Sequence, residues 1–185
     1  MNINLLIFWM LLGVFGVGTI EYLIAGVLPQ IASDVAVSEA TAGLLVTVYA
    51  LTVVVGGPAL TIFTSRVKRI PPLIVGLMTL FITGNVLTSV AHNFIIIARI
   101  MTALPHATFF ALCLVVATTL VEPEFQGRVI SRITLGLNLA TVLGVPLGTL
   151  VGNQYGWRTS FVIVAVLQTV VTVALVLTIR RVPER

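Results

Sequence analysis

Charged residues are scarce in this sequence of 185 residues. Asp, Glu, Lys and Arg make up 9% of it, whereas hydrophobic residues make up 58%. Soluble domains contain about 25% charged residues, so this chain has too little polar surface to stay in solution as a globule of this size. The apolar residues also occur in blocks of about twenty, the length that crosses a bilayer. The composition excludes a soluble protein and predicts an integral membrane protein.

Cysteine is nearly missing as well. Cys113 is the only one, which excludes an intramolecular disulfide and a cysteine-based metal site. It lies inside an apolar block, where a small buried hydrophobic side chain is favoured over a reactive thiol. The sequence also lacks HExxH, GxSxG and Walker-type motifs and any pattern resembling a nucleophile with its base. We therefore expect no enzyme, no bound metal and no cofactor.

Hydropathy divides the chain into six apolar blocks joined by short polar connections. Each block has about the 17–25 residues needed to cross 30 Å of hydrocarbon at 1.5 Å per residue. Main-chain polar groups must be paired within lipid, and no ten-residue alternation suggests a barrel. The predicted fold is all-α, an integral membrane bundle of six transmembrane helices forming a single domain over residues 1–185. The blocks are Leu5–Leu28, Ala42–Phe63, Pro72–Ala91, Phe94–Val121, Val129–Gly152 and Ser160–Ile179.

The basic residues predict how the bundle is oriented. If the helices alternate in direction, eight of the ten Lys and Arg residues fall in connections on one side. The positive-inside rule places this side, and with it both termini, in the cytoplasm. Because they are spread over several connections, they do not form a nucleic-acid-binding patch. The eight are Arg66, Lys68, Arg69, Arg128, Arg132, Arg180, Arg181 and Arg185.

Two charged side chains lie inside predicted spans. At the helical rise, Glu21 lies about 10 Å and Arg99 about 8 Å below the outer boundary. Inserting such a group costs roughly 2.5–3.5 kcal/mol or more, which is tolerated where it faces a partner or a polar cavity. We expect the two to approach each other, directly or through water, around a polar cavity; a purely structural pairing is the alternative. Asn85 and Asn138 also lie within spans and either line the cavity or hold helices together.

His106 extends the polar face of the fourth block. Thr102, His106 and Cys113 follow Arg99 by three, seven and fourteen residues, which places all four on one face of a helix. Histidine titrates near physiological pH, so His106 and Glu21 are candidates for handling protons. A histidine that only donates a hydrogen bond to a neighbouring helix is the alternative.

Small residues recur every four positions in the fifth block. Such a stripe lets another helix backbone approach closely, and a proline within it bends the helix. We expect tight packing, and a seam of this kind also permits rocking between helices. Gly56-Gly57-Pro58 lies 88 residues before Gly144-Val145-Pro146, which predicts two three-helix repeats. The stripe consists of Gly136, Ala140, Gly144, Gly148 and Gly152, with Pro146 inserted.

The chain resembles the major facilitator superfamily, specifically the bacterial drug and sugar efflux antiporters of the twelve-span type. The similarity covers essentially all 185 residues, and the order and spacing of its segments make it specific. The segments are Gly18-Thr19-Ile20-Glu21-Tyr22, Gly26-Val27-Leu28-Pro29-Gln30-Ile31-Ala32, Ala42-Gly43-Leu44 through Gly56-Gly57-Pro58, Ala98-Arg99-Ile100, His106-Ala107-Thr108-Phe109-Phe110, Gly144-Val145-Pro146-Leu147-Gly148-Thr149 and Gly156-Trp157-Arg158-Thr159-Ser160-Phe161.

The resemblance implies a transporter of the bacterial inner membrane that works by alternating access. It implies export of small organic solutes, such as drugs, sugars or nucleosides, driven by inward proton flow. Arg99 matches the fourth-helix arginine implicated in proton coupling, and Glu21 matches the acidic position of the first helix. The segment from Gly144 to Thr149 looks like the antiporter motif of the fifth helix.

The connection after the second block departs from the family pattern, which is Gly-x-x-x-Asp-Arg-x-Gly-Arg. Arg66, Lys68 and Arg69 keep its basic character and match the cytoplasmic gate loop. Ser65 stands where the aspartate is expected, and Lys68 where the glycine is expected. The charge pair that latches the inner gate in the family therefore lacks its carboxylate at this position.

The resembling transporters have two six-helix halves, whereas this chain has one. The resemblance implies a truncated or separately expressed N-terminal half, which we favour, or two copies that associate to restore a cavity. The expected partners are a small-molecule substrate, protons, the bilayer and a second six-helix half or a homodimer partner. The leading interpretation is a transporter or half of one. The alternative is a non-transporting membrane protein, either a remnant or an assembly partner.

Overall fold

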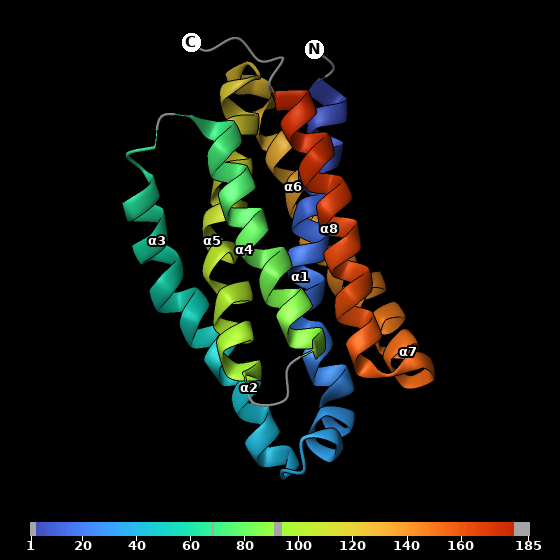
Figure 1. Cartoon of the computed structure of the whole chain (residues 1–185). Coiled ribbons are helices and arrows are strands. Elements are labelled where there is room, and N and C mark those ends of the chain that lie inside the picture. The colour runs from blue at the N-terminus through green and yellow to red at the C-terminus, as the bar shows by residue number, and fades with distance from the viewer. Residues whose placement is uncertain (1–2, 68, 91–93, 180–185) are drawn as a thin grey trace.

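The computed structural model describes residues 3–67, 69–90 and 94–179. It contains six helical spans, each long and apolar enough to cross a membrane (Figure 1). Within those ranges there is no strand. A lipid environment favours this outcome because a helix pairs almost all of its main-chain polar groups within itself. The prediction of an all-α bundle of six spans is confirmed.

Two of the six spans are interrupted by a π-helical turn. Span 1 is α1 (Ile3–Asp34), span 3 is α4 (Ile70–Val90), span 4 is α5 (Ile95–Thr119) and span 6 is α8 (Trp157–Ile179). Span 2 consists of α2 (Glu39–Leu51), the π-helical turn η1 (Thr52–Gly56) and α3 (Gly57–Thr64). Span 5 follows the short 3-10 helix η2 (Pro123–Phe125) and consists of α6 (Gln126–Leu139), the π-helical turn η3 (Ala140–Gly144) and α7 (Val145–Tyr155).

The first and fifth spans are longer than hydropathy predicts. The polar residue Gln30 and the preceding proline lie inside α1 rather than in a loop, because Ile31 and Ala32 beyond them are buried against neighbouring helices. Span 5 continues to Tyr155 and ends at Gly156, whose φ of 88° is a conformation that suits glycine. The predicted ends of these two blocks, at Leu28 and Gly152, were therefore wrong.

The contacts of span 1 resemble those of span 4, as expected if the first three spans and the last three spans are related units. Span 1 packs against spans 5 and 6, and span 4 packs correspondingly against spans 2 and 3. Spans 3 and 6 pack against each other across the two units. One contact lacks a counterpart of similar extent among the described residues, because spans 5 and 6 pack against each other and spans 2 and 3 do not. The arrangement agrees with the predicted pair of three-helix repeats.

The π-helical turns occupy matching places in the two units. Both η1 and η3 span five residues, and their starting points, Thr52 and Ala140, lie 88 residues apart. A proline follows each turn near the start of the next helix, at Pro58 and Pro146. Proline cannot donate the main-chain hydrogen bond of a regular helix, so the wider turn lies where the regular bonding pattern is already interrupted.

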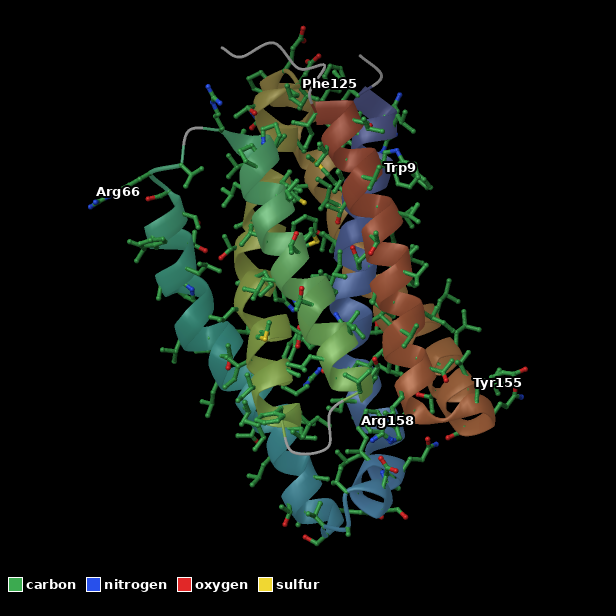
Figure 2. All side chains as sticks on the ribbon, viewed as in Figure 1. Trp9, Arg66, Phe125, Tyr155 and Arg158 are labelled. Atoms are coloured by element: carbon green, nitrogen blue, oxygen red, sulfur yellow. The ribbon has the colours of Figure 1, made fainter. Side chains whose placement is uncertain are left out.

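The two ends of the bundle are distinguished by the segments that lie at them. The start of α1 and the end of α8 lie at one end, together with the turns that follow α3 and α5 (Figure 1). Arg66 lies at this end, and Tyr155 and Arg158 lie at the opposite end (Figure 2). We call them the Arg66 end and the Arg158 end. The predicted basic residues Lys68, Arg180, Arg181 and Arg185 lie outside the described residues.

Candidate functional site

Four polar side chains gather where spans 1, 2 and 4 meet. They come from three helices: Glu21 from α1, Tyr49 from α2, and Arg99 and His106 from α5. Tyr49 and Arg99 are fully buried, and His106 is nearly so. We call these four residues the polar cluster.

Arg99 is the innermost member of the polar cluster. Its guanidinium lies over the Tyr49 ring at 4.2 Å from the ring centroid, and Nη1 donates to the main-chain oxygen of Ile20 at 3.3 Å. Nε and Nη2 have no hydrogen-bond partner among the described residues. In this six-helix unit an aromatic ring and helix backbone enclose the guanidinium, so Arg99 faces the interior of the bundle as predicted, and the polar cavity expected around it stays a prediction.

Glu21 lies next to His106, a neighbour that the predicted approach to Arg99 did not include. Glu21 Oε2 lies 3.8 Å from His106 Nε2, and the Glu21 side chain keeps 25% of its surface exposed. Glu21 and Arg99 also interact electrostatically, without a direct ion pair in the described residues. Glu21 is therefore the most exposed of the four cluster residues.

Tyr49 contacts both His106 and Arg99 within the polar cluster. Its hydroxyl lies 3.0 Å from Nδ1 of His106, while its ring lies against Arg99. If the phenol donates this hydrogen bond, the neutral imidazole carries its proton on Nε2, the atom that faces Glu21. The geometry can therefore pass a proton between the imidazole and the carboxylate with small movements of either side chain.

The polar face predicted on α5 is buried throughout. Arg99, Thr102, His106 and Cys113 are all buried, and the Thr102 hydroxyl donates to the Arg99 carbonyl. The shared burial follows from their helical spacing, which turns all four toward the interior.

The two predicted asparagines form no hydrogen bond with the described residues of the polar cluster. Asn138 is exposed on α6, and no hydrogen bond joins its side chain to another described residue. Asn85 is buried in α4, where its amide donates to the carbonyl of Phe81 in its own helix, so it is not interhelical glue through that bond. The Oδ1 atom of Asn85 has no partner among the described residues, and a role of either asparagine in lining a cavity stays a prediction.

The small residues of span 5 lie against α1. A Cβ added at Gly136 would meet the main-chain oxygen of Leu11 at 2.5 Å, and one at Gly148 would meet the side chain of Leu23 at 2.7 Å. Gly144 faces Thr19 in the same row. Main chains can approach this closely only where side chains are missing, so span 5 holds α1, and with it Glu21, at a fixed distance.

The predicted gate loop lies at the Arg66 end. Arg66 and Arg69 are exposed, and neither forms an ion pair with a residue that the structure describes. The third residue, Lys68, is outside that part of the chain. This agrees with the missing carboxylate at Ser65, because the connection itself supplies no acidic partner.

Tyr49 was missed in the sequence because a tyrosine within an apolar block resembles any other large hydrophobic residue. One pattern points to it: Ala42, Leu45 and Tyr49 recur at helical spacing and are the buried residues of α2. A phenol on the buried face of a membrane helix needs a hydrogen-bond partner. In the fold, His106 is that partner.

Comparison with protein families decides which group the chain falls into. The model of the family described as Major Facilitator Superfamily matches residues 10–185. The chain belongs to the major facilitator superfamily. The members of this family that it matches are membrane transporters, which agrees with the expectation of no enzymatic activity.

Several bacterial members of the superfamily are similar over most of this chain. The inner membrane transport protein YdhP of Escherichia coli strain K12 is 40% identical over 95% of the chain and 45% of its own length. The uncharacterized transporter YfhI of Bacillus subtilis strain 168 is 37% identical over 90% of the chain and 42% of its own length. A chloramphenicol resistance protein of Streptomyces lividans is 36% identical over 83% and 39%. The chain thus spans less than half the length of these relatives.

Proposed function

We propose that this six-helix unit is the N-terminal, proton-handling half of a major facilitator transporter that exports small organic solutes. The observation that carries the proposal is the Glu21–His106 pair, 3.8 Å apart inside the membrane span and partly open on the carboxylate side. A carboxylate in this position is costly to insert and is typically functional. Arg99 supplies a fixed positive charge beside the pair, and Tyr49 orients the imidazole.

The proposed cycle exchanges protons for solute at this pair. With Glu21 ionised, its partly exposed carboxylate carries a negative charge that attracts a proton or a polar solute group. Protonation removes that charge, and alternating access then reorients the site when this unit rocks against a second six-helix half. Glu21 and His106 hold the proton, whereas Tyr49 and Arg99 position them.

We also propose that the Arg66 end faces the cytoplasm of a bacterial cell and that the protein lies in the inner membrane. The positive-inside rule supports the orientation, and the printed name of the Escherichia coli relative supports the membrane. A maleimide-labelling experiment in intact cells tests the orientation. A cysteine introduced at Arg158 is expected to react with an impermeant reagent, and one at Arg66 only after the cells are lysed.

Efflux from vesicles tests the central proposal. The unit is reconstituted together with a C-terminal half from the Escherichia coli relative, and the loss of labelled solutes under an imposed proton gradient is measured. Chloramphenicol is included in the panel because one relative is named for resistance to it. We expect gradient-driven efflux that Glu21→Gln abolishes and His106→Gln strongly lowers.

Glu39→Gln is the matched control for the carboxylate. Glu39 is an exposed acid at the start of α2, away from the polar cluster, so its loss is expected to leave efflux unchanged. Equal efflux from wild type and Glu21→Gln would refute proton handling at this pair. Equal loss in both glutamine variants would point to a general charge effect instead.

The second candidate is a non-transporting membrane protein that assembles with a partner. It is favoured by the low burial of spans 2 and 5, which are the least buried of the six and carry exposed residues such as Val54, Val55 and Leu147. A second six-helix half or a second copy would cover such faces in either case. Efflux from vesicles that contain the assembled complex separates the two candidates, because an assembly partner without transport gives none.

A further inference from the structure

A pocket of about 640 Å³ lies at the Arg158 end, away from the polar cluster. Its wall comes from the last two turns of α1 and from the connection between α7 and α8. Gly156, with its φ of 88°, turns the chain between these two helices and places Tyr155 and Trp157 on either side of the turn. Most of the lining is apolar, with one cation and one anion at its edge.

The two charged groups of the pocket each keep unused hydrogen-bonding capacity. Arg158 Nη1 and Asp34 Oδ2 form an ion pair, while the guanidinium stacks over the Trp157 ring at 4.4 Å from its centroid. The remaining guanidinium nitrogens and the second carboxylate oxygen have no partner among the described residues, and about a third of each side chain is exposed. A guanidinium has five N–H donors and a carboxylate about four acceptor sites, so this pair can bind a further anion and a further ammonium group.

The surroundings of the pocket match the level of lipid headgroups. Tyrosine is enriched where the hydrocarbon of a bilayer meets water, and Tyr155, which is 71% exposed, lines this pocket, whereas Trp157 is buried beneath it. Apart from Arg99 inside α5, Arg158 is the only basic residue that the structure describes near this end. Asp34 is the ionic partner of Arg158, and both residues line the pocket with about a third of each side chain exposed.

We propose that this pocket binds the headgroup of a zwitterionic phospholipid that carries a phosphate and a primary ammonium group. The phosphate takes the free donors of Arg158, the ammonium takes the free oxygen of Asp34, and the start of the acyl chains lies along Tyr155 and Pro29, which are exposed. A choline headgroup has no N–H to donate to the free oxygen of Asp34, and a glycerol headgroup offers this oxygen only neutral hydroxyl donors instead of an ammonium group. The site therefore favours phosphatidylethanolamine over both.

Lipid retention by the purified chain tests this proposal. The chain in detergent is incubated with phosphatidylethanolamine, phosphatidylcholine or phosphatidylglycerol of identical acyl chains, and bound lipid is counted by native mass spectrometry. Because one charge-assisted hydrogen bond is lost with the other two headgroups, we expect roughly tenfold tighter retention of phosphatidylethanolamine than of either. Inorganic phosphate and O-phosphoethanolamine are run in parallel as soluble sources of the same chemistry.

The charge variants have opposite signatures. Arg158→Gln is expected to lower the retention of both phosphatidylethanolamine and phosphatidylglycerol, whereas Asp34→Asn lowers the first and raises the second. Arg128→Gln removes the same charge from the Arg66 end and is expected to change neither. Ser33→Trp fills the pocket while leaving the ion pair intact, so it tests the site even if the charge variants lose helicity by circular dichroism.

Three results would overturn the proposal. They are equal retention of all three lipids, unchanged retention in both Arg158→Gln and Ser33→Trp, and binding of soluble O-phosphoethanolamine as tight as that of the lipid. The proposal is independent of proton handling, because Glu21→Gln is expected to retain phosphatidylethanolamine like the wild type. A failure of one proposal is thus distinguishable from a failure of the other.

Discussion

Spans 2 and 5 share one backbone design but are packed in different ways. Each has a π-helical turn and a following proline at an offset of 88 residues. In span 5, small residues contact α1 along nearly the whole length of the helix. Of the three glycines in span 2, Gly56 and Gly57 lie against side chains of α5, whereas a Cβ added at Gly43 would meet nothing within 4 Å.

The difference shows that a π-helical turn does not by itself determine how firmly the following helix is held. Gly57 is the only buried residue of α3, and this helix lies at the edge of the bundle (Figure 1). The part of span 2 before the turn is anchored by Tyr49, whose hydroxyl contacts His106. We infer that span 5 acts as a rigid support for α1, and that α3 is the more easily displaced segment.

The largest expected effect is that of Gly136→Ala. The added methyl group would lie 2.5 Å from a main-chain oxygen of Leu11, and backbone atoms cannot move aside without separating α1 from α6. We expect a loss of about 3 kcal/mol in the free energy of unfolding, the upper part of the range for overpacking, measured by denaturant titration in detergent. Gly43→Ala is the control, and it is expected to be neutral or stabilising by up to about 1 kcal/mol.

Tyr49→Phe is expected to have the next largest effect. The variant keeps an aromatic ring over Arg99 but leaves Nδ1 of the buried His106 without its partner. Leaving such a group unpaired costs about 1–3 kcal/mol, so we expect a loss of about 2 kcal/mol. Tyr155→Phe removes a hydroxyl from a tyrosine that is 71% exposed. If both variants lose the same stability, Tyr49 is not the anchor of span 2.

Gly57→Ala measures how easily α3 moves. Its added methyl group would meet Cβ of Ala107 in α5 at 2.7 Å. This is a contact with a side-chain atom and not with the main chain. Because α3 can shift outward, we expect a loss of about 1 kcal/mol, the lower part of the overpacking range. A loss as large as that of Gly136→Ala, in the same titration, would contradict the inference that span 2 is the looser of the two.

The smallest effect is expected for Thr61→Val. The Thr61 hydroxyl lies 2.9 Å from that of Thr108 in α5 and also donates to the carbonyl of Gly57 in its own helix. Thr178→Val loses only a bond to its own helix, so the difference between the two variants isolates the interhelical contact. We expect that difference to be about 0.5 kcal/mol, at the low end for a hydrogen bond.

Long-range contacts limited what the sequence could predict. Hydropathy located all six spans, and helical spacing correctly grouped Arg99, Thr102 and His106 on one buried face. It could not identify the main-chain oxygen of Ile20 as the acceptor for Arg99, because every residue carries a carbonyl. The Gly-Pro pairs predicted bends but not π-helical turns, since the extra residue in a turn depends on how the two ends of the helix are held.

The number of residues in each π-helical turn also determines how the helix after it is oriented. A π-helical turn holds about one residue more than an α-helical turn, and each residue turns a helix by about 100°. Deleting one residue between Thr52 and Gly56 would therefore leave a regular helix but rotate everything after it, moving Gly57 and Thr61 away from α5. We therefore expect Thr52–Gly56 and Ala140–Gly144 to tolerate the exchange of one hydrophobic residue for another better than the deletion of a residue.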